Sequence, residues 1–283
     1  MKQNIQKFKN IPQKLLEISD PPKELYIEGE MPGNEYKFLS VIGSRKFTSY
    51  GKDVCESLIE SLKGFPIVII SGLALGIDSI AHESAIKNGL KTIAIPGSGL
   101  SEKSIYPRTN FHLSRKILDS GGCLISEFAP DFKATTWSFP RRNRIMAGLS
   151  DAVLLIEAEE KSGTLITARL AMEYNRDVLV VPGSIFSKNS SGTNRLIKDG
   201  AHPVLSANDI LQMLGFKEQN KVEKEYRDCN DDELHVLGML YEPTPKEILM
   251  QKYDGDISKL NMILTLLEIK GHIKETFGEI RKV

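Results

Sequence analysis

The fold class is indicated most clearly by the stretch Ile67-Val68-Ile69-Ile70-Ser71-Gly72-Leu73-Ala74-Leu75-Gly76-Ile77-Asp78. Its four leading apolar residues predict a strand that is buried on both faces. The glycines that follow permit a tight turn whose backbone can approach a ligand closely. Helical periodicity then resumes from about Ile77 to Asn88. The stretch therefore predicts a strand, a glycine turn and a helix in succession.

The same succession repeats along the chain. We expect strands at 38–42, 67–70, 92–95, 123–126, 152–156 and 178–181, and a short extended segment at 25–27. We expect helices at about 49–63, 77–88, 110–120 and 164–175, with a last one near 207–214. This alternation is typical of an α/β fold with a mostly parallel sheet that carries helices on both faces.

Most of the predicted strands end in a glycine turn. Right-handed crossovers place the carboxyl ends of parallel strands at one edge of the sheet, and ligands bind along that edge where the strand order reverses. We therefore expect several glycines that are scattered in the sequence to converge in space: Gly43, Gly72, Gly76, Gly97 and Gly163.

The composition excludes several classes of protein. The 283 residues carry 37 basic and 37 acidic side chains, so overall charge does not attract the chain to nucleic acid, although a local basic groove is compatible with it. No apolar run approaches the length of a membrane span and the N-terminus has no signal core, so we expect a cytoplasmic location. Three distant cysteines support neither a disulfide framework nor a zinc site, and we expect no metal and no cofactor.

The sequence divides into four parts. Residues 1–36 form a polar N-terminal lead-in, and residues 37–216 form the sheet domain. Residues 217–228 are highly charged and are interpreted as a linker. Residues 229–283 predict three short helices and a hairpin around Phe277-Gly278, which together suggest a winged-helix domain.

A block of positive charge stands out in this neutral chain. The window from Lys133 to Ser150 has no acidic residue. Arginine binds phosphates through a planar fork of donors, and an aromatic ring offers a face on which a base can stack. The window predicts a site for a nucleic acid, and its candidate residues are Lys133, Trp137, Phe139, Arg141, Arg142 and Arg144.

Glycine turns add further candidates. Gly43-Ser44-Arg45 lies between a strand and a helix, where free N–H groups, a hydroxyl and a guanidinium can hold a phosphate. Ser162-Gly163-Thr164 precedes a helix in the same way, although Ser162 could instead cap that helix. Gly192-Thr193-Asn194 repeats this pattern near Arg195 and Lys198. Together with Ser71, Gly72 and Gly76, these turns indicate a ligand that is rich in phosphate.

No set of residues predicts catalysis. Asp78 and His82 share one helical face, at a spacing that would suit a metal or an acid–base pair, but a structural role that braces the helix is favoured. The chain has no Gly-x-Ser-x-Gly nucleophile motif and no HExxH motif.

The motifs, in their order, resemble those of the DNA-processing protein A family, also called DprA or Smf. The resemblance covers about residues 38–205, and Asp20-Pro21-Pro22-x-x-Leu25-Tyr26 extends it into the lead-in. The matching residues are Gly43-Ser44-Arg45, Thr48, Tyr50-Gly51, Ser71 to His82, Tyr106-Pro107, Ser126-Glu127, Phe139-Pro140-x-Arg142-Asn143-Arg144, Glu157-Ala158, Ser162 to Ala168, Pro182-Gly183 and Gly192-Thr193-Asn194-x-Leu196-Ile197. Where some members have a lysine three residues before the phenylalanine, this chain has Thr136, so Lys133 or Arg141 would have to supply that charge.

The resemblance implies an extended Rossmann-like sheet and a bacterial protein that binds single-stranded DNA without being an enzyme. It implies protection of incoming strands during natural transformation and loading of the RecA recombinase onto strands covered by single-strand-binding protein. It also implies a homodimer. Residue by residue, Arg45 would hold a phosphate, Ser71, Gly72 and the Gly163–Thr164 turn would offer backbone donors, and Phe139 would lie against a base. Asp78, His82 and Asn143 would be structural.

Two other classes of protein remain as alternatives. Nucleotide-cleaving phosphoribohydrolases have a related sheet and resemble Pro-Gly-Gly-x-Gly-Thr-x-x-Glu, but Thr167 stands where that catalytic glutamate would be. A winged-helix transcription factor should have a basic recognition helix. The helix expected at 257–271 carries Lys259 and Lys270 against Glu268, which is a weak match to that requirement.

Overall fold

The computed structural model describes residues 4–8, 10–217, 226, 228–240, 243–276 and 278–282. The chain divides into two compact units, Met1–Glu218 and Gln219–Val283. Each unit has its own hydrophobic core. Most of the expected linker at 217–228 lies outside the described residues, as does Phe277 of the expected hairpin.

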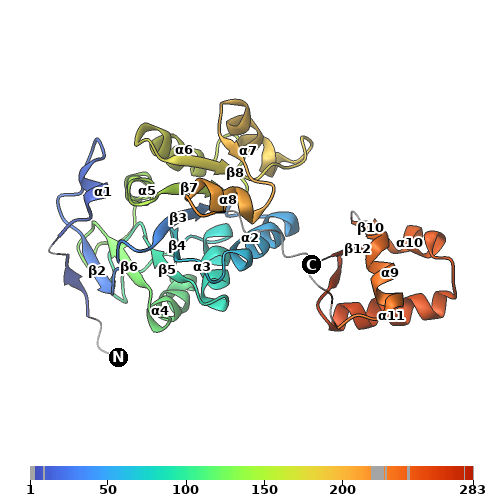
Figure 1. Cartoon of the computed structure of the whole chain (residues 1–283). Coiled ribbons are helices and arrows are strands. Elements are labelled where there is room, and N and C mark those ends of the chain that lie inside the picture. Colours follow the sequence, from blue (N-terminus) through green and yellow to red (C-terminus); the bar gives the residue numbers. More distant parts are fainter. Residues whose placement is uncertain are drawn as a thin grey trace. The chain divides into compact units, whose positions relative to one another are not determined.

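The first unit is built on a nine-stranded sheet (Figure 1). The strands β6, β5, β4, β3, β7, β8 and β9 are parallel, whereas β2 pairs with β6, and β1 with β2, in antiparallel register. In spatial order the strands are β1 (Gln6–Lys7), β2 (Tyr26–Gly29), β6 (Cys123–Ser126), β5 (Lys91–Ala94), β4 (Ile67–Ser71), β3 (Lys37–Ile42), β7 (Ala152–Leu155), β8 (Asp177–Val180) and β9 (His202–Pro203). The order reverses between β3 and β7, which is the Rossmann-like switch point.

Both faces of the sheet are covered, as the apolar strands require. Phe38, Val68 and Ile70 pack into one core with α5 (Ser138–Leu149) and α6 (Thr164–Glu173). Leu39 and Ile69, which point the other way, pack with α2 (Ser49–Ser61), α3 (Ile77–Lys87) and α8 (Ala207–Met213). Figure 1 shows these two groups of helices on opposite sides of the strands. The predicted α/β fold is confirmed.

The lead-in belongs to the first unit. Its strands β1 and β2 extend the sheet, because β2 pairs along β6 from Tyr26↔Ser126 to Gly29↔Cys123. Its short helix α1 (Gln13–Leu16) buries Leu15, which packs with Ile18 against Gly148 of α5. The remaining helices of the unit are α4 (Phe111–Asp119) and α7 (Lys188–Lys198).

The second unit combines helices with a small antiparallel sheet in the order β10-β12-β11. Its core includes Val236, Leu249, Leu264 and Ile280. The elements are consistent with a winged-helix-like domain: α9 (Asp231–Met239), β10 (Thr244–Pro245), α10 (Lys246–Lys252), α11 (Ile257–Ile269), β11 (Ile273–Thr276) and β12 (Glu279–Lys282). Within the parts of the chain that the structure describes, no helix has the length and apolar character needed to cross a bilayer.

Candidate nucleic-acid interface

A cleft of about 520 Å³ opens where the strand order reverses. Its floor is at the carboxyl end of β3, and the first turns of α5 and α6 form its walls. It is lined by Ile42, Gly43, Ser44, Arg45, Lys46, Ala74, Asp78, Phe139, Pro140, Arg142, Asn143, Met146, Glu159, Ser162, Gly163, Thr164, Ile166 and Thr167. The place is the one that the switch-point rule predicts for a ligand.

The scattered glycine turns meet here, as expected. A Cβ on Gly43 would lie 2.7 Å from the side chain of Ile77, and one on Gly97 would lie 2.6 Å from the ring of Phe139. A Cβ on Gly76 would overlap the carbonyl oxygen of Ser44 and come within 2.7 Å of Arg45 Cα. The hydroxyl of Thr164 donates to Gly43 O over 3.2 Å, which joins the turns after β3 and before α6.

The basic segment begins α5, and the helix separates its residues by face. Phe139, Arg142, Asn143 and Met146 have helical spacing and line the cleft. Arg141 is exposed and Arg144 is buried, and both contact Glu127 rather than the cleft. The three arginines of Arg141-Arg142-Asn143-Arg144 are thus divided between the cleft and the ion pairs with Glu127.

Arg142 places a buried positive charge in the cleft. Its side chain donates from Nη1 to Ile95 O over 2.7 Å, and it lies directly over Gly72, where a Cβ would overlap the guanidinium. Burial lowers the pKa of Arg142 to about 10, with Asp78 acting against this shift. The guanidinium therefore stays protonated at neutral pH, and its Nε is buried without a hydrogen-bond partner among the described residues.

Arg45 and two aromatic side chains surround the opening. The Arg45 guanidinium lies 5.5 Å from the ring centroid of Phe139, within the range of a cation–π contact. Tyr106 packs on the same ring, with 5.8 Å between the centroids, and is 49% exposed. A nucleotide that enters here can therefore place its phosphate near a cation and its base against an aromatic face.

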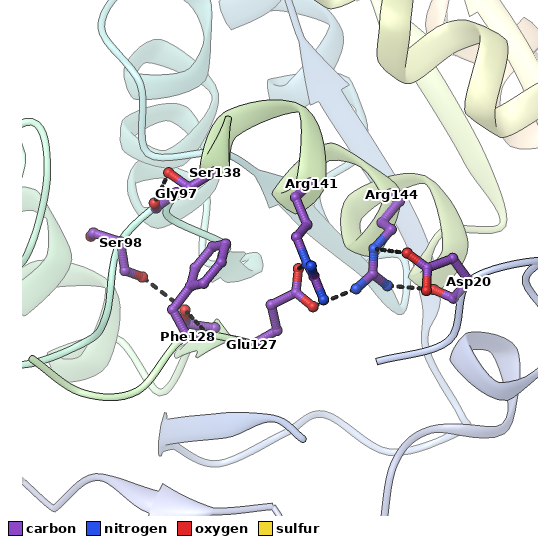
Figure 2. A network of polar contacts seen from close by, with 9 residues as sticks. Asp20, Gly97, Ser98, Glu127, Phe128, Ser138, Arg141 and Arg144 are labelled. Carbon is purple, nitrogen blue, oxygen red and sulfur yellow. Dashed lines mark hydrogen bonds and ion pairs between the residues drawn. The ribbon is translucent and has the colours of Figure 1, made fainter. Parts of the chain in front are cut away.

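Arg144 is held inside the protein, which corrects its expected role in DNA contact. Its Nη2 donates to Glu127 Oε2, and its Nε lies 3.2 Å from Asp20 Oδ2 (Figure 2). Arg141 Nε donates to Glu127 Oε1 over 3.1 Å from the exposed side. The ion pair between Arg144 and Glu127 is buried. Arg144 ties α5 to the end of β6 and to the lead-in.

Two of the expected backbone donors, the N–H groups of Gly72 and Thr164, are already engaged, and so is the Ser71 side chain, which is a second correction. Gly72 N donates to Asp78 Oδ2 over 3.1 Å, and the Ser71 hydroxyl donates to Val41 O over 2.7 Å. Thr164 N donates to the Ser162 hydroxyl over 3.2 Å, although the N-cap residue of α6 is Gly163 and not Ser162. These groups therefore shape the cleft, and the side chains that can contact a ligand by charge or by stacking are those of Arg45, Arg142 and Phe139.

Gly192-Thr193-Asn194 is not a turn before a helix, because it lies inside α7. Gly192 N donates to Ala158 O over 2.8 Å, and a Cβ at Gly192 would lie 2.7 Å from that oxygen. Asn194 holds both the N–H and the carbonyl of Gly183. Because Gly192 has no side chain, α7 can pack closely against the segment that follows β7.

Lys133 and Trp137 lie outside the cleft lining. Both precede α5, and Trp137 is the residue directly before the helix. Trp137 is 53% exposed and packs edge-on against Phe128 and Phe132, with centroid distances of 5.7 and 5.5 Å. Lys133 is exposed beside this aromatic group. Figure 2 shows Phe128 beneath the start of α5, where the Ser138 hydroxyl donates to Gly97 O.

Asp78 and His82 do not form a pair with each other. Asp78 accepts from the backbone of Gly72 and Ala74, while burial raises its pKa and Arg142 opposes that shift. His82 is fully buried, with Nδ1 2.7 Å from the Thr92 hydroxyl, which itself donates to Ile69 O. Each side chain braces a different element around the turn after β4, which supports the structural role.

The buried His82 predicts a pH dependence of stability. Burial lowers the pKa of His82 to about 3 from its ordinary value of 6.5, so the unfolded chain takes up a proton between these values that the folded chain does not. Stability is therefore lost as the pH falls below 6.5. His82→Asn keeps an N–H near the Nδ1 position and does not titrate. We expect the advantage of the wild type over this variant, measured by urea unfolding, to shrink by about 2 kcal/mol from about pH 8 to about pH 5. A difference that is constant with pH would contradict the buried neutral imidazole.

Several residues of the site were not among the predicted ones. Lys46 and Glu159 line the cleft, and each directly follows a motif that was selected. Glu157 is buried and accepts from both the N–H and the hydroxyl of Thr48, so it fixes the start of α2. Lys46, Glu157 and Glu159 all follow the carboxyl end of a parallel strand, β3 or β7, and this position could have indicated that they lie near the site.

The second unit brings together a group that the sequence did not indicate. Asp228, Cys229 and His272 each offer one possible metal-ligand atom within 4.8 Å of the others. His272 Nε2 lies 2.8 Å from Asp228 Oδ1, and Lys270 Nζ lies 2.7 Å from Glu233 Oε2 beside them. The contact between His272 and Asp228 brings two of the three groups together, and Cys229 is the neighbour of Asp228 in the sequence.

The fold and the cleft define a Rossmann-like α/β protein whose glycine turns and cationic side chains meet at the switch point of the sheet. The model of the family described as DNA recombination-mediator protein A matches residues 4–215. The chain belongs to this family.

Known relatives agree in sequence and in structure. Protein Smf of Escherichia coli K12 is 42% identical over 205 residues, which are 72% of this chain and 54% of that protein. DprA of Bacillus subtilis 168 is 40% identical over 207 residues, 73% of this chain and 69% of that protein. The chain thus spans about half the length of the Escherichia coli relative.

Two solved structures share the fold. DprA from Streptococcus pneumoniae is 38% identical with a TM-score of 0.69, and the similarity covers 77% of this chain and 76% of that one. DNA processing protein A from Helicobacter pylori, described with a unique single-stranded DNA binding mode, is 32% identical with a TM-score of 0.67, over 75% of this chain and 96% of that one.

Proposed function

We propose that this chain binds single-stranded DNA in the cleft at the switch point and does no chemistry on it. The observation that carries the proposal is the contact of the Arg45 guanidinium with the Phe139 ring, beside the buried charge of Arg142. A cation next to an aromatic face suits a strand whose phosphates and unpaired bases alternate. The single-stranded DNA binding described for the Helicobacter pylori relative supports it.

The charge is local rather than global. Whole-chain charge is zero, whereas Arg45, Lys46 and Arg142 line one cleft together with Asp78 and Glu159. Three cationic side chains thus face two carboxylates in the lining, so the cleft has a positive balance. A binding site of this kind takes a strand at one point and leaves the rest of the surface without attraction for nucleic acid.

We propose a wider role as a cytoplasmic recombination mediator. In this role the chain receives a strand during transformation or recombination, protects it and helps RecA replace single-strand-binding protein, acting as a homodimer. The family description as a recombination-mediator protein supports this role. In the second unit, the cations of the helix that would read duplex DNA are paired within the protein, Lys259 with Asp232 and Lys270 with Glu233. That supports protein contacts, or weak DNA contacts, for this unit.

The test is fluorescence anisotropy with a labelled oligonucleotide, single-stranded and then duplex, across a salt series. Arg45→Ala should weaken single-strand binding and reduce the salt slope by about one, since one phosphate contact is lost. Phe139→Ala should cost about 1–3 kcal/mol per stacked base and leave the salt slope nearly unchanged. Arg141→Ala, on the other face of α5, is the matched control and should bind nearly as the wild type does.

Wild-type affinity in both cleft variants would move the site elsewhere. Equal binding of duplex and single strand would remove the single-strand function. Thr167 lines the cleft where related nucleotide-cleaving enzymes have a glutamate, and it is 1% exposed. Sustained release of base or ribose phosphate from a nucleotide would therefore be needed to assign the chain to those enzymes, and we expect none.

A further inference from the structure

A second cleft of about 450 Å³ lies at the same edge of the sheet, at the carboxyl ends of β7 and β8. It is lined by Thr48, Tyr50, Glu157, Pro182, Gly183, Ser184, Ser187 and Ser190. The Tyr50 hydroxyl donates to Pro182 O over 2.8 Å and spans the cleft from α2 to the end of β8. Nothing in the proposed function uses this cleft.

Its rim exposes two large apolar side chains. Ile185 is 84% exposed and Phe186 is 93% exposed, and they lie between the lining residues Ser184 and Ser187. Tyr50, in the first turn of α2, lines the cleft and is 45% exposed, and Phe47, just before that helix, is 43% exposed. A group of exposed apolar and aromatic side chains, at a sheet edge that already carries a proposed site, indicates a surface that a ligand covers.

The two clefts are joined by one short segment. Lys46 lines the first cleft, and its carbonyl oxygen accepts a hydrogen bond of 2.7 Å from Asn189 Nδ2 in the first turn of α7. Lys188 precedes Asn189, is exposed, and follows the rim of the second cleft. The path from Arg45 through Lys46 to Lys188 therefore places cations beside exposed aromatic rings.

The second cleft favours bases over phosphates. Glu157 lines it with both carboxylate oxygens held by Thr48, and within the described residues no cation pairs with that carboxylate. An anion in the cleft would meet this negative charge, whereas a flat base can lie against Tyr50 or Phe186. Phosphates can stay at the rim with Lys46 and Lys188.

We propose that the single strand leaves the first cleft over Lys46 and continues to the second one, where Tyr50 and Phe186 stack its bases. The inference rests on the proposed function, since it extends the same strand beyond the first cleft. If the strand occupies both clefts, the protein contacts more nucleotides than the first cleft alone can hold.

The experiment compares binding of two labelled oligothymidylates, one of about 6 nucleotides and one of about 20, because a short strand fills one site and a long one can fill both. Ile185→Ala/Phe186→Ala should leave the short strand bound as by the wild type and weaken the long one roughly tenfold. Phe186→Trp should keep the wild-type affinity for the long strand, since the stacking face is retained. Leu16→Ala is the control, because this exposed leucine lies in α1, next to residues that pack at the carboxyl end of α5 and away from this edge.

Each other outcome overturns the inference in a distinguishable way. Unchanged binding of the long strand by the double variant would remove the second site and leave the first cleft intact. An equal loss for both strands would show that residues 185 and 186 act on the first cleft or on the fold. A lower oligomeric state in sedimentation, with unchanged binding, would assign the surface to contacts between copies of this chain. Failure of the wild type to bind either strand would instead remove the proposed function itself.

Discussion

Glu127→Gln is expected to destabilise the first unit by about 3 kcal/mol, because it removes the buried one of the two carboxylates that pair with Arg144 and leaves only the exposed Asp20. The side chains of Glu127 and Arg144 are 5% and 6% exposed, and both are held between α5, the end of β6 and Asp20 of the lead-in (Figure 2). A glutamine has nearly the same shape, so the loss reports the charge and not a cavity. The measurement is urea unfolding followed by far-UV circular dichroism.

Arg141→Ala is the matched control for this experiment. It removes the other partner of Glu127, but the Arg141 side chain is 51% exposed and its pair is open to solvent. Such a pair contributes about 0–1 kcal/mol. A loss of similar size in both variants would show that Arg144 is not the buried partner that depends on Glu127. Arg144→Met, which removes the buried cation and leaves Arg141 on Glu127, should cost less than Glu127→Gln.

The layers of the fold followed from short patterns in the sequence. Strands that are apolar on both faces, such as Ile67–Ser71, can be satisfied only between two layers of helices, and the crossover rule then places their glycine turns at one edge. Gly43, Gly76 and Gly97 could therefore be placed near one another without a structure. The antiparallel attachment of β2 to β6 could not be predicted, because a strand of four residues carries no signal for which edge of the sheet it joins.

The division of the arginines was harder to predict. The sequence does not distinguish the roles of Arg141, Arg142 and Arg144. Their roles differ because α5 begins at Ser138 and turns successive residues to different faces of the helix. One helical register decides that Arg142 reaches the cleft and Arg144 reaches Glu127. A window of positive charge predicts a site, but burial decides which of its charges remain for a ligand.

The other large effect is expected from Gly76→Ala, which should destabilise the protein by about 3 kcal/mol or more and weaken single-strand binding as well. Gly76 has φ +84° and ψ −132°, a conformation that residues with a Cβ rarely adopt. A Cβ would also overlap Ser44 O and press on Arg45 Cα, so the turn that carries Arg45 must move. Unfolding and anisotropy measured on the same preparation would detect the two effects.

Gly89→Ala separates backbone strain from the clash at Arg45. Gly89 ends α3 with φ +71°, but a Cβ there meets no atom within 4 Å. This variant should lose only the strain of a left-handed residue, about 1–2 kcal/mol, and should bind a single strand as the wild type does. If Gly76→Ala kept full affinity as well, the position of Arg45 would not depend on the close contact between the turns after β3 and β4. The cleft would then have to be held by α5 and α6 alone, through Thr164 on Gly43 and Arg142 on Ile95.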